Sequence, residues 1–119
     1  MSDSKPLNPG LFRVHRLFMV LYAVLCTLLI LIGLKGAATG DWGSFGGLFV
    51  FGVFLGAIGL AHWHAMKGAS LGKTYGRRIS RIFGCLWLIG FPIGTILGVY
   101  VLVKASDGNW VAETPEAPA

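Results

Sequence analysis

An uncharged apolar stretch from Leu17 to Leu34 is the feature that most limits how this chain can fold. Arg16 and Lys35 bound the stretch, which contains 18 residues. At a helical rise of about 1.5 Å per residue it would extend about 27 Å, close to the roughly 30 Å hydrocarbon thickness of a bilayer. A segment of this length and composition is typical of a transmembrane helix.

Two further apolar blocks have the same character. No Asp, Glu, Lys or Arg lies between residues 43 and 66, and none lies between residues 82 and 103. Only 13% of the residues are charged, against roughly 25% in an ordinary soluble domain. Because a lone strand in lipid leaves its backbone groups unpaired, the blocks predict helices. We therefore expect an all-α integral membrane protein, a single domain over residues 11–105 with three transmembrane helices over about 12–34, 43–66 and 81–104.

The distribution of basic residues predicts which ends of the helices face the cytoplasm. Eight of the ten lysines and arginines lie before the first block or between the second and third, and cytoplasmic segments are enriched in these residues. The polar N-terminal segment 1–10 and the basic loop 67–80 are therefore expected in the cytoplasm, with the C-terminus outside. The tail 106–119 contains prolines and acids without apolar periodicity, so we expect it to be disordered.

Glycines recur at helical spacing in the second and third blocks. The positions are Gly52, Gly56 and Gly59 in the second block and Gly90, Gly94 and Gly98 in the third. Small residues let helix backbones approach closely in lipid, so these stripes predict packing of helix two against helix three, with self-association or a partner's helix as the alternative. Pro92 lies within the third block and is expected to kink that helix.

The segment between the second and third blocks carries a cluster of bases without an acid. The cluster consists of Lys67, Lys73, Arg77, Arg78 and Arg81. Such clusters bind anionic headgroups at about 1 kcal/mol per base, although the same residues also serve as the signal that orients the protein. A nucleic-acid partner is not expected, because Tyr75 alone provides no stacking platform.

Three histidines are the only candidates for binding a metal ion or haem. His62 and His64 are two residues apart and would point to different sides of a helix, and only His15 is placed to approach them from the first helix. They remain weak candidates, so no cofactor is expected. Cys26 and Cys85 would lie about 9 Å apart in depth, which disfavours a disulfide. No nucleophile lies at a workable spacing from a base, and we expect no enzyme activity.

The end of the third block carries a resemblance to known proteins. Arg77-Arg78, followed by Phe91-Pro92-Ile93-Gly94-Thr95-Ile96-Leu97-Gly98-Val99-Tyr100, resembles the closing helix of small three-span bacterial inner-membrane proteins of uncharacterised function, with an FPIGT-x-LG-x-Y-like pattern. The resemblance covers about a fifth of the chain. It implies a multi-pass protein of the bacterial cytoplasmic membrane and carries no catalytic residue across.

These features favour a small accessory, scaffold or assembly subunit that acts by helix–helix packing within a larger inner-membrane complex. Its expected partners are a bilayer with anionic headgroups and either another membrane protein or further copies of itself. A homo-oligomeric channel or small-molecule exporter is the alternative. A haem- or metal-binding membrane subunit that uses His62, His64 and His15 is a third hypothesis.

Overall fold

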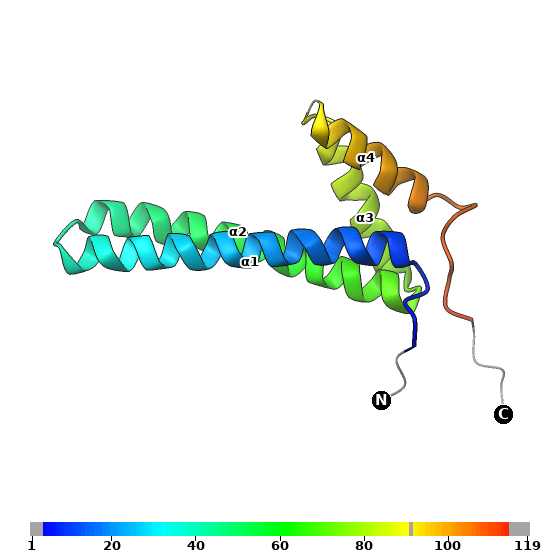
Figure 1. The fold of residues 1–119 in the computed structure, drawn as a ribbon, viewed down its shortest axis with the longest axis horizontal. Helices are drawn as coiled ribbons and strands as arrows, with labels where there is room; N and C mark the ends of the chain where they lie inside the picture. Colours follow the sequence, from blue (N-terminus) through cyan, green and yellow to red (C-terminus); the bar gives the residue numbers. More distant parts are fainter. Residues whose placement is uncertain (1–3, 91, 115–119) are drawn as a thin grey trace. The chain divides into compact units, whose positions relative to one another are not determined.

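The computed structural model describes residues 4–90 and 92–114, and within these ranges the chain forms helices and no strand. The four helices are α1 (Pro9–Ala38), α2 (Trp42–Leu71), α3 (Thr74–Trp87) and α4 (Ile93–Lys104), as labelled in Figure 1. The predicted all-α class is confirmed. The chain divides into two compact units, which we call the central unit (residues 16–63) and the terminal unit (residues 1–15 and 64–119).

Local sequence signals explain where the two long helices begin and where α2 ends. Pro9 occupies the first position of α1, where a missing N–H is harmless. Asp41 precedes α2 and accepts a hydrogen bond from the Ser44 N–H at 3.1 Å, and its hydrogen bonds with Ser44 lower the pKa of the Asp41 carboxyl. Gly72 follows the last residue of α2 with φ of 68°, a left-handed conformation that glycine adopts without strain.

The central unit is an antiparallel pair formed by α1 and α2, whose close approach depends on glycines. A Cβ added to Gly56 would lie 3.6 Å from the Cys26 sulfur, and one added to Gly59 would lie 3.3 Å from Tyr22 Cβ. Cys26 Sγ donates a hydrogen bond to the Gly52 carbonyl at 3.2 Å. The stripe was expected to face helix three, but it packs against α1, because the short turn at residues 39–41 makes α1 its nearest neighbour.

Most of the central unit's large apolar side chains point outward. In the most apolar windows of 18 residues, only 6% of α1 and 11% of α2 is buried, and both helices are long and apolar enough to cross a membrane. The exposed side chains in this unit include Leu17, Val20, Leu21, Val24, Leu28, Leu31, Val50, Phe51, Val53, Phe54 and Leu60. Most of the apolar surface of α1 and α2 therefore faces the surroundings of the protein, and only a small part is buried within it.

The third apolar block departs from the expected continuous helix over 81–104. Figure 1 shows α3 and α4 folded back on each other, joined by a turn between Trp87 and Ile93. Pro92 has no N–H to continue a helix, and the Gly90 N–H donates to the Trp87 carbonyl at 2.9 Å in a tighter turn. Thr95 Oγ1 donates to the Leu88 carbonyl at 3.0 Å across the break. The proline therefore precedes the first residue of a separate helix, α4, whereas the sequence predicted a bend within one continuous helix.

The expected irregular loop over 67–80 is also mostly helical. α2 continues to Leu71, and α3 begins at Thr74 after a two-residue corner. The glycines on both sides of the corner let the helices touch, since a Cβ added to Gly76 would lie 2.5 Å from the Gly68 carbonyl carbon. The core of the terminal unit is correspondingly small: Leu11, Ala69, Val101 and Ala105 are buried, with Val14, Trp87 and Trp110 packed around them.

The three glycines of the third block differ in what surrounds them. A Cβ added to Gly98 would lie 2.6 Å from the Gly84 carbonyl oxygen on α3, and one added to Gly94 would lie 2.6 Å from the Trp87 carbonyl oxygen. At Gly90 the nearest atoms are 3.5 Å away, an ordinary contact. Gly94 and Gly98 are therefore required for the approach of α4 to α3, and Gly90 is not.

Alanine should therefore change the stability of the protein by different amounts at Gly98 and Gly90, although both belong to the same glycine stripe. Gly98→Ala should lower the free energy of unfolding by about 1–3 kcal/mol, because the methyl group forces α3 and α4 apart. Gly90→Ala is the matched control and should change it by less than about 0.5 kcal/mol. Circular dichroism during heating of the detergent-solubilised protein measures both. Equal losses at the two positions would contradict the packing described for α4.

Candidate functional site

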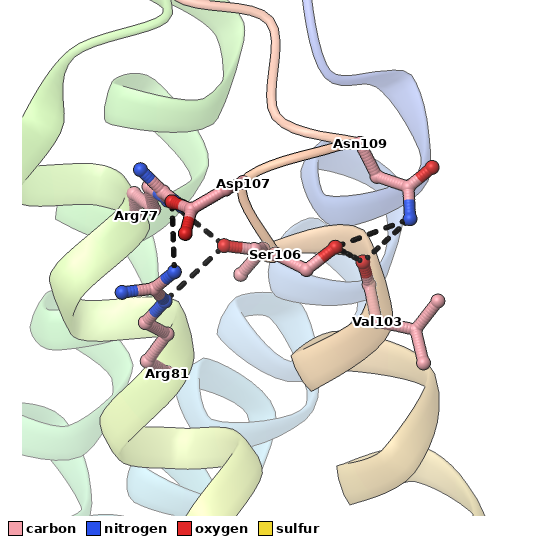
Figure 2. Close-up of polar contacts among 7 residues, drawn as sticks. Arg77, Arg81, Val103, Ser106, Asp107 and Asn109 are labelled. Atoms are coloured by element: carbon pink, nitrogen blue, oxygen red, sulfur yellow. Dashed lines mark hydrogen bonds and ion pairs between the residues drawn. The ribbon is translucent and has the colours of Figure 1, made fainter.

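Two arginines on one face of α3 bind the end of α4. Arg77 and Arg81, four residues apart, donate their Nε–H groups to the Ala105 carbonyl at 2.8 and 3.2 Å. Both also form ion pairs with Asp107, as Figure 2 shows, with an Arg81–Asp107 distance of 3.5 Å. Ala105 directly follows α4, so the two guanidinium groups lie at the negative end of that helix dipole. We call these four residues the arginine cluster.

Polar side chains from the tail complete the end of α4. Ser106 Oγ and Asn109 Nδ2 both donate to the Val103 carbonyl, at 2.7 and 3.0 Å, so a carbonyl in the last turn of the helix is satisfied (Figure 2). Further along the tail, Glu113 forms an ion pair with Lys73 at the α2–α3 corner. The described part of the tail is therefore held in place by contacts, where the sequence predicted disorder over 106–119. Residues 115–119 lie outside the described part of the chain.

Asn8 joins three segments of the terminal unit. Its side-chain amide donates to the carbonyls of Ala69 at 3.0 Å and Val111 at 2.9 Å, and its Oδ1 accepts the Val111 N–H at 2.8 Å. The Asn8 N–H also donates to the Ala69 carbonyl at 3.1 Å, and the residue is only 6% exposed. The amide thus uses both donors and its acceptor, and it connects the start of α1 to the end of α2 and to the tail.

A buried histidine pairs with a serine nearby. His15 Nε2 and Ser80 Oγ are 2.8 Å apart, and both residues are fully buried. The single hydroxyl hydrogen of Ser80 is donated to the Gly76 carbonyl at 2.8 Å. Ser80 therefore accepts from His15, which assigns a proton to Nε2. The imidazole also lies against Phe83 and Trp87, with ring centroids 6.0 and 6.4 Å away.

The other two histidines have unlike environments. In the central unit, His62 is fully buried and stacks against Phe18 and Tyr22, with both centroid distances 5.5 Å. His64 is exposed, so the two side chains do point to different sides of α2. Among residues 4–90 and 92–114, no group of three or more His, Cys, Asp or Glu side chains is placed to hold a metal ion.

The predicted basic cluster is divided by the structure. Lys73, Arg77 and Arg81 form ion pairs with acids of the tail. Lys67 and Arg78, like Arg81, are exposed. Sequence reasoning missed these pairs because it assigned the tail to the opposite side of a membrane. In the structure, the hydrogen bonds between Asn8 and Val111 place the described part of the tail beside the N-terminal segment. The break between α3 and α4 allows these contacts, because α4 then runs back along α3 towards the α2–α3 corner.

Comparison of the chain with family models, with curated proteins and with solved structures found no match.

Proposed function

We propose that this chain is a small integral membrane protein that serves a larger inner-membrane complex as an accessory, scaffold or assembly subunit. The observation that carries the proposal is the outward-facing apolar surface of the central unit. Soluble monomers rarely expose a contiguous apolar surface of this kind. Lipid or the helices of another membrane protein would cover it.

A groove in the central unit supports a role in helix packing. Residues of both α1 and α2 line it, and several of them are small. The lining includes Met19, Ala23, Cys26, Gly56, Gly59 and Trp63. Small residues at such a surface permit close approach of a further helix, which in lipid is the main source of helix association. A transmembrane helix of a partner fits this groove.

The use of the polar groups also favours an accessory role. The arginine cluster, Asn8 and the His15–Ser80 pair each bind other parts of the terminal unit, so their hydrogen bonds serve its internal structure. We propose that the bases at the α2–α3 corner set the orientation and contact anionic headgroups, with both chain ends on the cytoplasmic side. A bacterial cytoplasmic membrane fits the resemblance of the closing segment to small bacterial inner-membrane proteins.

Fractionation and native mass spectrometry of the tagged full-length chain test this proposal. We expect the protein to stay with bacterial membranes during washing with alkaline carbonate and to need detergent for release. In the detergent extract, we expect a second protein to travel with it at fixed stoichiometry. Recovery in the soluble fraction would overturn the membrane assignment. A single homo-oligomer without a second protein would overturn the accessory role and favour the channel or exporter alternative.

A further inference from the structure

We infer that the α3–α4 hairpin enters a single leaflet of the bilayer, on the side of its bases, and leaves by that same side. The inference rests on the proposed membrane location and adds a lipid-contacting surface within the terminal unit. Three independent features of the hairpin lead to it. These are its exposed apolar tip, the placement of charge at its base, and the internal hydrogen bonds in the described part of its turn.

The tip of the hairpin exposes its large apolar side chains. Ile89 in the turn is 82% exposed, and Ile93 and Ile96 on α4 are 72% and 70% exposed. On α3, Ile82 and Leu86 are exposed as well, and with Cys85 they line a shallow apolar depression. Side chains of this size seldom gather outward on a surface that faces water. The apolar face of the hairpin therefore requires an apolar environment.

Charge is confined to the base of the hairpin. Arg81 on α3 and Lys104 on α4 bound a segment without a charged residue. Residues 67–113 contain six bases and two acids, so this base is cationic and complements anionic headgroups. Arg81 lies eight residues before Ile89, and Lys104 lies eleven residues after Ile93. At about 1.5 Å per residue, the segments 81–89 and 93–104 extend about 12 and 16 Å. These lengths match one leaflet of about 15 Å and are too short for a full crossing of the bilayer.

Several N–H groups in the described part of the turn donate to carbonyls of the hairpin itself. The N–H groups of Ile89 and Gly90 donate to the carbonyls of Leu86 and Trp87 at 3.3 and 2.9 Å. The Gly94 N–H donates to the Gly90 carbonyl at 2.6 Å, and Pro92 has no N–H to satisfy. An unpaired backbone group in the hydrocarbon region would be penalised by several kcal/mol, so these internal hydrogen bonds lower the penalty of inserting the tip.

Site-directed labelling of the full-length protein tests the inference. In a variant with Cys26→Ser and Cys85→Ser, single cysteines are introduced as Thr39→Cys, Thr74→Cys, Ile89→Cys or Gly108→Cys. Thr74 begins α3, Gly108 follows α4 with nothing within 4 Å of an added Cβ, and Thr39 lies between α1 and α2. A membrane-impermeant maleimide is applied to right-side-out and inside-out vesicles from expressing bacteria. For depth, a nitroxide at position 89 is exposed to oxygen and to a nickel chelate in phosphatidylcholine–phosphatidylglycerol vesicles.

We expect the cysteines at 74 and 108 to react from one side and the cysteine at 39 to react from the other. The nitroxide at 89 should collide mainly with oxygen, which partitions into lipid. Labelling of 74 and 108 from opposite sides would overturn the inference, because the segment would then cross the membrane. Frequent collisions with the nickel chelate would place the tip in water, and shielding from both reagents would place it against protein; either result rejects lipid as the occupant. Failure of the proposed membrane location itself is distinguishable, since alkaline carbonate would then release the chain.

Discussion

Replacing Gly76 with alanine should disrupt the terminal unit. A Cβ at this position would lie 2.5 Å from the Gly68 carbonyl carbon and 2.8 Å from the Ala69 nitrogen, and both are backbone atoms that cannot move aside alone. The corner between α2 and α3 would have to open, which displaces Ser80 one turn further along α3 from its hydrogen bond with His15. We expect a loss of about 3 kcal/mol or more in the free energy of unfolding, at the upper end of overpacking effects.

Heating of the purified protein in detergent, followed by circular dichroism, measures this loss. Gly46→Ala is the matched control, because Gly46 also lies within a helix, α2, but has nothing within 4 Å of an added Cβ. Alanine is the better helix former by about 1 kcal/mol, so the control should be neutral or slightly stabilising. A Gly76→Ala variant as heat-resistant as the parent would show that α2 and α3 do not approach each other here.

Asn8→Asp should have a comparable effect with almost no change in side-chain size. The asparagine amide donates to the carbonyls of Ala69 and Val111, and a carboxylate at the same place would direct a negative oxygen at two acceptors. A buried charge that loses its partners is penalised by about 3–5 kcal/mol. We expect α1, α2 and the tail to separate at this junction, seen as a lower unfolding temperature and as faster proteolysis after residue 105.

The pH dependence of this variant identifies the cause of its loss. Burial beside two carbonyls would raise the folded-state pKa of the new carboxyl above the unfolded value of about 3.9. The variant should therefore regain stability as the pH falls toward 3.9 and lose it as the pH rises through the folded-state value. Asn109→Asp is the control, because Asn109 is exposed and donates to the Val103 carbonyl from the surface. Equal losses at both positions would contradict the role assigned to Asn8.

The first two helices could be predicted from the sequence because their signals are local. An uncharged block longer than 17 residues, a proline at the first helical position and an aspartate before α2 depend on no distant contact. The glycine stripe of α2 was also recognisable, but its partner was not. The spacing of the glycines shows that another helix can approach this face of α2 closely, but it does not show which helix does so. The choice of α1 over the third segment follows from the short turn between the two helices.

The third block could not be assigned correctly from length and hydropathy. The 22 uncharged residues 82–103 are long enough for one transmembrane helix, but they are equally compatible with two short helices folded into a hairpin. What decides between them is Pro92 together with the ion pairs of Asp107 with Arg77 and Arg81, a contact between residues 26 to 30 positions apart. The role of Asn8 could not be predicted from the sequence, because it requires Val111, which lies 103 residues away.

The dependence of Asn8 on Val111 sets an order of events during biosynthesis. The central unit has all its residues by the time residue 63 has been synthesised, so α1 and α2 can pair while the ribosome is still translating. The terminal unit cannot, because its junction requires the carbonyl and the N–H of Val111, which is synthesised after the whole central unit. Its closure must therefore wait until residue 111 has been synthesised, and a nascent chain stalled before that residue would present α3 and α4 without the segment that holds them to the start of α1.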